Sequence, residues 1–220
     1  MNQTSIKLPL PELLGYFALS LVINALGNGI TVALNLGSAL WTASAVNISH
    51  ILPIDLGTVM MGLGGLTIIA NALLLRKWEW RRVLGNLIFM LPFSYLVGGF
   101  SALVARLPWG SLPLWGRILF DLLGICLIAI GISLYQRVNL MLHPSDDLMQ
   151  IIRFHFFKGS AVRAQLVAFM PPLVLILICV VISHHIYAVN IGTIFSLAFS
   201  GSVVGWADTH IFPRLKHQRI

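Results

Sequence analysis

The sequence predicts an all-α membrane protein: six transmembrane helices in two inverted-topology three-helix repeats, each with a short amphipathic or re-entrant segment after its first helix. Three observations favour this fold class. The composition is too apolar for a soluble domain, apolar runs about one membrane thick recur, and the positive charges fall in alternate loops. Apolar residues make up 58% of the chain and charged residues 10%, whereas soluble domains carry about 25% charged residues.

The apolar runs are each long enough to cross a hydrocarbon core about 30 Å thick as a helix. The six helices are expected at residues 13–34, 56–75, 83–105, 116–136, 164–183 and 189–211. Two acidic residues, Asp121 and Asp208, fall within these limits. We expect Asp121 to pair with Arg117 on the same helix face near the membrane surface. Asp208 is expected to have a structural role near the basic C-terminal cluster.

Prolines and cysteines also fall inside the expected helices. Pro92 and the Pro171-Pro172 pair should kink the helices that contain them. Cys126 and Cys179 lie in apolar runs and are expected to be small core residues, not a disulfide or a metal site.

Residues 36–52, between the first two expected helices, are nearly apolar enough to form a seventh span. A span there would put basic clusters on opposite sides of the membrane, against the usual rule. The serine, threonine and asparagine content favours a short amphipathic or re-entrant segment. The re-entrant, interfacial and spanning alternatives stay open at this point.

The positive charges predict the orientation. Four regions hold 12 of the 14 Lys and Arg residues: the N-terminus with Lys7, the loop 76–82, the loop 137–163 and the tail with Arg214, Lys216 and Arg219. The loops at 35–55 and 184–188 contain no Lys or Arg. With six spans, all four basic regions fall on one side, so both termini should be cytoplasmic.

The two halves of the chain resemble each other weakly. At an offset of 104 the matches are Ala25 with Ala129, Gly27 with Gly131, Asn35 with Asn139 and Leu36 with Leu140; at an offset of 107 they are Gly85 with Gly192 and Gly98 with Gly205. The repeats would cover about residues 13–106 and 116–212 of a single integral membrane domain, residues 1–220. An odd number of spans per half inverts the second half, as in many secondary transporters with a site at the repeat interface.

Short motifs follow the first helix of each half. "GISLYQRVNLMLHPSDDL" has the form G-x-x-L-x-x-x-x-N-L and then P-x-D-x-L, and "GNGITVALNLGSALWTAS" fits much of N-L-G-S-x-P-W-D. These motifs resemble the YitT/YczE-type family of small bacterial multi-pass integral membrane proteins. The resemblance implies a bacterial cell-membrane protein of largely unassigned activity. Leu40 and Thr42 stand where the pattern has Pro and Asp, which implies an asymmetric site.

The segment from Asn139 to Leu148 has two interpretations. In the first, Pro144 opens a short helix, and Asp146 and Asp147 stabilise the positive end of its dipole. In the second, two broken helices aim side chains at a shared cavity, for which Ser38 and Pro144 mark the helix starts. The candidate ligand-binding residues are then Asn35, Trp41, Asn139, His143 and Asp146.

The leading functional hypothesis is a transporter-like protein that binds or moves a small solute or ion. One alternative is the substrate-binding membrane subunit of a vitamin-type ABC importer, docking through the small-residue ridge Ala25-Gly29-Ala33; another is a non-transporting scaffold or regulatory protein. Small-residue helix faces could also join copies of the chain. We expect lipid contact but no nucleic-acid partner, cofactor, metal site or enzyme activity, because no hydrolase, zinc-protease or P-loop motif occurs.

Overall fold

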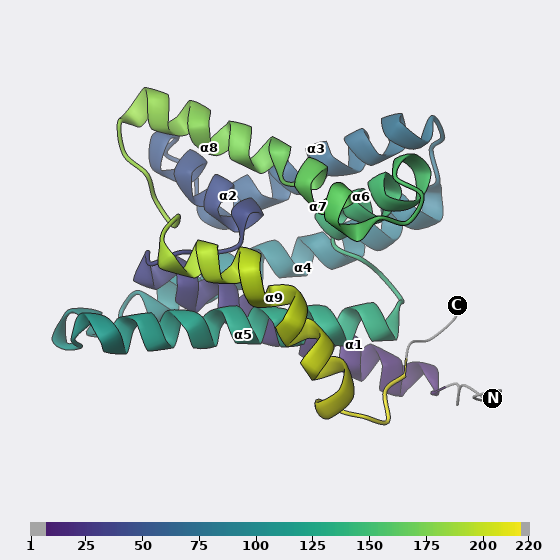
Figure 1. The fold of residues 1–220 in the computed structure, drawn as a ribbon, viewed down its shortest axis with the longest axis horizontal. Coiled ribbons are helices and arrows are strands. Elements are labelled where there is room, and N and C mark those ends of the chain that lie inside the picture. Colours follow the sequence, from purple (N-terminus) through teal and green to yellow (C-terminus); the bar gives the residue numbers. More distant parts are fainter. Residues whose placement is uncertain (1–7, 217–220) are drawn as a thin grey trace.

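The computed structural model describes residues 8–216, and these residues are helical with connecting loops. The helices are α1 (Leu10–Leu34), α2 (Leu40–Ile51), α3 (Leu56–Leu75), α4 (Trp80–Val104), α5 (Leu114–Val138), α6 (Pro144–Ile151), α7 (Ala161–Ala168), α8 (Met170–Ser183) and α9 (Ile191–His210) (Figure 1). A 3-10 turn, η1 (Trp109–Ser111), precedes α5, and a π-helical turn, η2 (Ile152–Phe156), follows α6. Lys7 and Arg219, which contributed to the charge pattern, lie outside the described residues.

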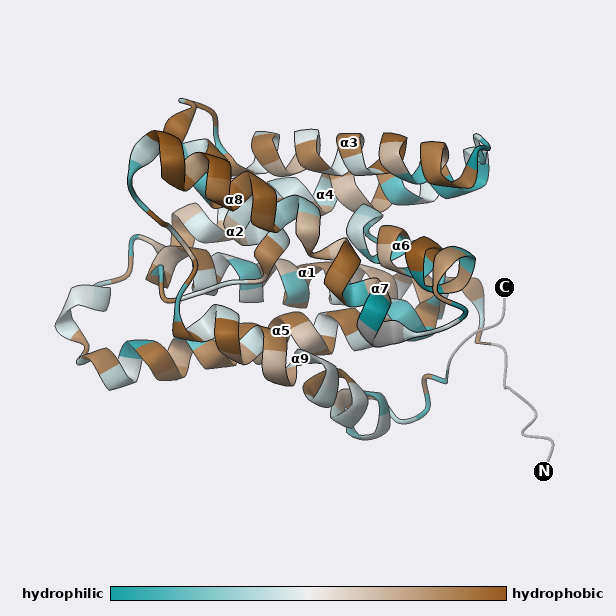
Figure 2. Cartoon of the chain, turned by 45° about the horizontal axis from the view of Figure 1, so that its top comes forward, coloured by the Kyte–Doolittle hydropathy of each residue, from teal (hydrophilic) through white to brown (hydrophobic). Residues whose placement is uncertain are grey.

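Six segments of the described chain are long and apolar enough to cross a membrane: Leu10–Leu34, Leu56–Leu75, Trp80–Val104, Leu114–Val138, Arg163–Ser183 and Ile191–His210. They confirm the six predicted helices, whose ends differ by three residues at most. Figure 2 shows hydrophobic residues, coloured brown, along much of the long helices, as contact with lipid requires. Both cysteines within these segments are free thiols; Cys179 is buried in the core, whereas Cys126 is only half-buried.

The fifth span is interrupted near its prolines. α7 ends at Ala168 and α8 begins at Met170, with Phe169 between them. Proline has no backbone N–H and clashes with the preceding turn, so Pro171 and Pro172 cannot continue the hydrogen-bond ladder of α7. They are tolerated at the start of α8, where those donors have no partner in any case. The helix α4, in contrast, continues through Pro92.

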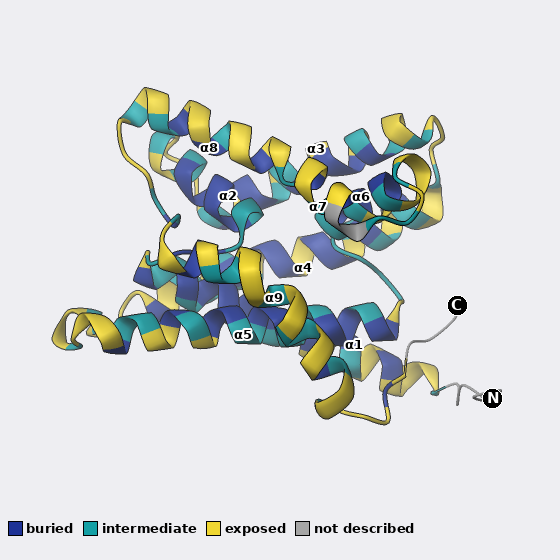
Figure 3. Ribbon diagram, viewed as in Figure 1, coloured by how far each residue is buried: buried dark blue, intermediate teal, exposed yellow. Residues whose placement is uncertain are grey.

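The segment after α1 forms the short helix α2. Its 12 residues span about 18 Å, too little to cross the hydrocarbon core, so the seventh-span alternative is wrong. Six consecutive residues, from Thr42 to Asn47, are buried, and α2 packs against α8, α3 and α1 (Figure 3). A helix buried on all sides is not amphipathic in the sense predicted. Its serine, threonine and asparagine side chains are satisfied inside the protein instead.

The helices α1 and α5 cross at two glycines. A Cβ on Gly27 would lie 2.5 Å from the carbonyl oxygen of Gly124 and 2.8 Å from the backbone nitrogen of Ile128. A Cβ on Gly131 would lie 2.6 Å from the Cβ of Asn24. The absence of side chains therefore lets the two backbones touch, which is how helices associate tightly in lipid.

The predicted ridge of Ala25, Gly29 and Ala33 packs inside the protein. Ala25 is fully buried, and a Cβ on Gly29 would meet the Cβ of Phe100 on α4 at 2.6 Å. At Ala25 and Gly29 the ridge that was expected to dock a partner helix therefore packs within the chain, while Ala33 is half-buried. Gly201 and Gly205 on α9 differ, since a Cβ at either position would meet no described neighbour within 4 Å.

The expected pair of Arg117 and Asp121 does not form. Asp121 is 1% exposed, and one of its carboxylate oxygens packs against Gly192 at the start of α9. Its other oxygen, Oδ1, and Nε of Arg117 have no hydrogen-bond partner among the described residues. The side chain of Asp121 turns towards α9 instead of following its own helix back to Arg117.

Asp208 has a structural role, and Ser133 and Arg137 of α5 are two of its partners. The Ser133 hydroxyl donates to Asp208 over 2.6 Å, and Nε of Arg137 lies 3.5 Å from the same carboxylate. Arg137 is 1% exposed. Its guanidinium donates to the carbonyl of Ser133 on α5 and to four later carbonyls, those of Asp208, Ile211, Phe212 and Leu215. Arg137 thus holds the end of α9 and the following turn against α5.

Candidate ligand-binding cavity

A cavity of about 330 Å³ lies between the helices, at the lower end of the range of small-molecule sites, about 300–1,000 Å³. Every helix from α1 to α7 contributes to its lining, and so does α9. The first turns of α2 and α6, which follow the first long helix of each half, both reach it. The cavity therefore lies where the two halves of the chain meet.

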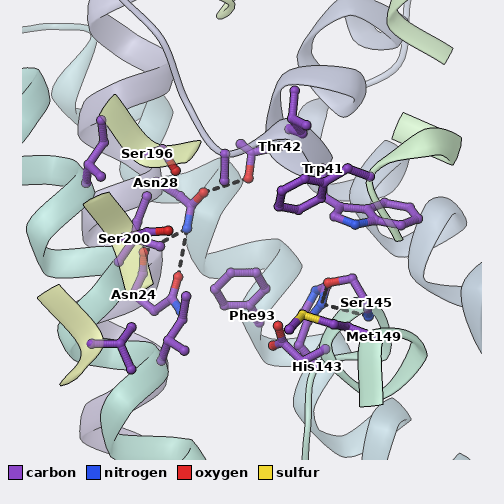
Figure 4. Close-up of a pocket in the computed structure, with 18 of the residues that line it drawn as sticks. Asn24, Asn28, Trp41, Thr42, Phe93, His143, Ser145, Met149, Ser196 and Ser200 are labelled. Carbon is purple, nitrogen blue, oxygen red and sulfur yellow. Dashed lines mark hydrogen bonds between the residues drawn. The ribbon is translucent and has the colours of Figure 1, made fainter. Parts of the chain in front are cut away.

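Two opposite walls of the cavity differ in chemistry (Figure 4). One wall carries amide and hydroxyl groups, those of Asn24, Asn28, Thr42, Ser196 and Ser200. The other carries the Trp41 ring, the His143 imidazole and Ser145, with Phe93 between the two walls. A ligand that fills the space would therefore meet hydrogen-bonding groups on one side and aromatic rings on the other.

The amide wall is ordered by hydrogen bonds along α1. Nδ2 of Asn28 donates to the side-chain oxygen of Asn24 over 2.8 Å and to its backbone carbonyl over 3.0 Å. The Thr42 hydroxyl on α2 donates to Oδ1 of Asn28 over 2.6 Å. Nδ2 of Asn24 donates to no described residue, so it is a donor available to a ligand.

The adjacent carboxylates Asp146 and Asp147 have different partners. Asp146 lines the cavity and accepts a hydrogen bond from the Tyr135 hydroxyl of α5. Asp147 is buried, accepts from Nδ2 of Asn86 over 2.9 Å and lies 3.6 Å from Nε of Arg82. Asp147 therefore ties α6 to the start of α4, and only Asp146 is presented to the cavity.

Burial away from water shifts the pKa values of the titratable side chains at the start of α6. Burial raises the pKa of Asp146 to about 6, against the lowering effect of the Tyr135 hydrogen bond. Burial lowers the pKa of His143 to about 4, so the imidazole is neutral near pH 7. Burial also raises the pKa of Asp147, against the opposing effects of Asn86 and Arg82. At neutral pH the cavity thus presents an ionised Asp146 beside a neutral imidazole.

His143 is also the residue that caps α6. Its Nδ1 accepts from the backbone N–H of Ser145 over 3.3 Å and lies 2.7 Å from the Ser145 hydroxyl. Asp146 and Asp147 lie in the first turn of the helix, as the capping interpretation predicts. The side-chain cap itself comes from the histidine, which that interpretation did not assign. Among the described residues, no three His, Cys, Asp or Glu side chains gather closely enough to hold a metal ion.

Of the five predicted ligand-binding residues, Trp41, His143 and Asp146 line the cavity. Asn35 and Asn139 do not. Both adopt left-handed backbone conformations, with φ of 52° and 53°, at the ends of α1 and α5. Asparagine tolerates this conformation at a helix end. The side chain of Asn35 accepts from the backbone N–H of Ala188 over 2.6 Å, so it fixes a loop instead of facing a ligand.

Ser38 does not start α2 as predicted. Its backbone N–H and hydroxyl both donate to the carbonyl of Ala188, over 2.9 and 3.3 Å, and Thr193 donates to its carbonyl over 3.0 Å. Ala39 occupies the cap position instead. Ser38 thus pins the segment after α1 to the start of α9.

Sequence reasoning missed several cavity residues, chiefly Asn24, Asn28, Thr42 and Tyr135. A signal for the first two was present, because two amides one turn apart on one face interrupt an otherwise apolar span. The positions 104 residues later are Ile128 and Ile132, which also line the cavity. The first half therefore supplies the amides from its long helix, and the second supplies the carboxylate from its short one.

Comparison with known proteins gives a family without an assigned activity. The model of DUF6198, a family of unknown function, matches residues 13–209. An uncharacterised protein of Haemophilus influenzae is 29% identical over 203 residues, which cover 91% of this chain and 84% of the relative. No solved structure matches the chain. The span of the match, which includes all six long apolar segments almost completely, places the chain in the family DUF6198.

Proposed function

We propose that this protein is a non-enzymatic, transporter-like protein of the bacterial cell membrane that binds a small solute in the cavity between its two halves. The observation that carries the proposal is the cavity itself, lined from both halves by amide, hydroxyl, aromatic and carboxylate groups. Polar groups within a membrane domain are costly unless they face a cavity or a partner. We include in this proposal a relationship to the YitT/YczE-type proteins, which the motifs after the first helix of each half suggest.

The proposal includes an inverted repeat, which the matching ends of the helices support. α1 and α5 each have 25 residues, start 104 positions apart and end at a left-handed asparagine. α3 and α8 end at left-handed Arg76 and His184. Each short helix packs on the opposite half, α2 on α8 and α6 on α3.

The crossing of α1 and α5 supports the same arrangement. Gly27 approaches Ile128, and Gly131 approaches Asn24. Gly27 and Gly131 lie 104 positions apart, and so do Asn24 and Ile128. The second contact is therefore the first one with the roles of α1 and α5 exchanged. A two-fold axis that relates antiparallel helices produces this exchange, and such axes in the membrane plane are typical of secondary transporters.

The topology can be tested with two single cysteines. Glu79 lies in the basic loop before α4, and Tyr187 lies in the loop before α9. With Cys126 and Cys179 replaced by Ala, Glu79→Cys should react only with reagents added from the cytoplasmic side, and Tyr187→Cys only from outside. Labelling of both from one side would remove the inverted repeat and the orientation together.

Solute binding can be tested by thermal stability of the purified protein in the presence of ions, vitamins, amino acids and amphiphiles. At least one compound should stabilise the protein. Ser200→Trp, which fills the cavity from α9, should abolish this stabilisation, whereas Ser202→Trp on the exposed face of the same helix should not. A screen with no hit, or a hit equally strong in both variants, would reject the cavity as a solute site.

The alternative of an ABC-importer subunit was motivated by the small-residue ridge of α1, and the packing of this ridge counts against it. Two of the three residues of the α1 ridge that would dock a transmembrane partner pack within the chain: Ala25 is fully buried, and Gly29 lies against Phe100 of α4. Purification of the chain alone or with a second membrane subunit and ATPases distinguishes the two proposals.

A further inference from the structure

We propose that the cavity binds a small organic ammonium ion, with the nitrogen beside Asp146 and the apolar part against the rings of Trp41 and Phe93. This inference rests on the proposed role of the cavity as a solute site and names the chemical class of the solute. Three properties of the cavity lining define the class of solute: its charge, the placement of its aromatic rings and its hydrogen-bond donors without partners among the described residues.

The charge of the lining favours a cation. Among the described residues that line the cavity, Asp146 is the one that is charged near neutral pH, and neither lysine nor arginine contributes. His143 is neutral there because its pKa lies at about 4. An anion would meet a carboxylate with no positive group to offset the loss of water. A cation would gain the charge partner that Asp146 otherwise lacks.

The rings complete a site for an ammonium group. Trp41 and Phe93 face the interior of the cavity near His143 (Figure 4), and Phe89 and Phe169 also contribute to the lining. The faces of aromatic rings attract cations by about 0.5–2 kcal/mol, and more strongly where water is excluded. A carboxylate combined with several ring faces therefore suits an ammonium ion that carries an apolar group.

The amide wall limits how apolar the solute can be. Nδ2 of Asn24 and the hydroxyls of Ser196 and Ser200 lie on the far wall from the aromatic rings, without hydrogen bonds to described residues. A wholly apolar solute would cover these groups and leave them unpaired, at about 1–3 kcal/mol each. A hydroxyl or amide at the end opposite the nitrogen would satisfy them.

Protons should compete with the ammonium ion for Asp146. The titratable groups around this carboxylate are Tyr135, which donates to it from α5, and His143 and Asp147 of its own segment. The cations of adjacent elements have other partners: Arg82 contacts Asp147 and Glu79, and Arg153 of η2 donates to the carbonyl of Gly159. α3 contains no titratable residue, and Arg163 of α7 is exposed.

The test uses three probes that share one ring: phenethylammonium, 2-phenylethanol and phenylacetate. Isothermal titration of the purified protein at pH 7 should show phenethylammonium binding at least about tenfold more tightly than the other two. With the pKa of Asp146 at about 6, its ionised fraction falls from about nine-tenths at pH 7 to about one-tenth at pH 5. Phenethylammonium should therefore bind about tenfold more weakly at pH 5, while 2-phenylethanol should not change.

Two neighbouring substitutions give a matched control. Asp146→Asn should abolish the preference for phenethylammonium and its pH dependence. Asp147→Asn removes the same charge one residue away, outside the cavity lining, and should retain both. If Asp146→Asn does not fold, the pH series on the unmodified protein decides the question.

Equal binding of the alcohol and the ammonium ion, or pH-independent ammonium binding, would overturn the inference and leave a neutral-solute site in place. Failure of all three probes to bind at about 10 mM would also overturn it, since even that affinity is weaker than a built site provides. The proposed function itself fails only if the broader screen yields no ligand whose effect Ser200→Trp removes.

Discussion

The two halves of the molecule close differently around the cavity. In the first half α3 packs along α4, and a Cβ on Gly57 would lie 3.0 Å from the carbonyl oxygen of Ser94. Gly98, one turn further along α4, faces Gly57 as well. In the second half α9 packs chiefly on α5. A Cβ on Gly205, the position equivalent to Gly98, or on Gly201, which is equivalent to Ser94 at the same offset of 107, would meet no described neighbour within 4 Å. Most of α8 and α9 is exposed (Figure 3).

Under the proposed function, this difference bears on how a solute would reach the cavity. The α9 residues that line the cavity include Ser196, Ser200 and Gly201, small residues that offer little apolar area to a neighbouring helix, beside Leu197 and Val204. The α3–α4 pair is held by close backbone contact and should move as a unit. If the protein moves a solute, as proposed, we expect α8 and α9 to move in preference to α3 and α4.

The largest loss of stability is expected at the crossing of α1 and α5, where the two halves have equivalent glycines. Gly27→Leu and Gly131→Leu each force a side chain into the backbone of the opposite helix, which cannot withdraw, so each should cost more than about 3 kcal/mol of stability. Both should reduce the yield of monodisperse protein in size-exclusion chromatography. Gly62→Leu, on an exposed position of α3, is the control. A mild effect at one of the two glycines would break their equivalence.

A second pair of substitutions compares how tightly α4 and α9 pack against their neighbours. Gly98→Leu should cost about 1–3 kcal/mol, because its side chain meets Gly57 of α3. Gly205→Leu, at the equivalent position of α9, should cost less than about 0.5 kcal/mol, since a Cβ there meets no described neighbour within 4 Å. Thermal unfolding in detergent measures both. Equal losses would mean that α8 and α9 are as tightly closed as α3 and α4.

The two short helices are tied to the rest of the protein by different chemistry. Asn47 of α2 exchanges two hydrogen bonds with the backbone of Tyr187, at 2.7 and 3.0 Å, whereas Asp147 of α6 contacts Arg82 and Asn86. Asn47→Ala and Asp147→Ala should each cost about 1–2 kcal/mol. The cost of Asp147→Ala should shrink at high salt, because Arg82 is partly exposed and its attraction is screened. The cost of Asn47→Ala should not.

The last predicted effect is a change in the pH dependence of stability, caused by two groups at the start of α6. The folded-state pKa of Asp146, about 6, is above its unfolded value of 3.8, so its contribution to stability is lost as pH rises through that window. The pKa of His143, about 4, is below its unfolded value of 6.5, so its contribution is lost as pH falls through that window. The two slopes oppose each other between about pH 4 and pH 6.

Removing either titratable side chain should therefore reveal the effect of the other on the pH dependence of stability. Relative to the unmodified protein, Asp146→Asn should make stability rise more steeply with pH, and His143→Gln should make it fall, each by on the order of 1 kcal/mol over this range. Denaturant midpoints between pH 4 and pH 6.5 measure the slopes. A shift of the same sign in both variants would contradict the assigned protonation states.

The sequence was sufficient for the long helices and only partly sufficient for the cavity. Hydrophobic length determines a span, so the six helix positions followed from the apolar runs alone. Trp41, His143 and Asp146 could be predicted because each lies just after a helix break. The partners of Asp147 could not, because Asn86 is 61 residues away and reaches it through the packing of α6 beside α4. Asn35 and Asn139 were correctly placed at helix ends, but their backbone role outweighed the expected contact with a ligand.

The buried guanidinium of Arg137 has a consequence for how the protein is made. Apart from the carbonyl of Ser133 one turn earlier, its carbonyl acceptors lie 71 to 78 residues later in the chain, so they do not exist when α5 leaves the ribosome. At about 5–20 residues per second, synthesis of that stretch takes roughly 4 to 16 s. During this interval the charge must remain in water at the membrane surface. The end of α5 can therefore settle only after the final residues have been made, and truncation before Leu215 should leave a protein that inserts but does not mature.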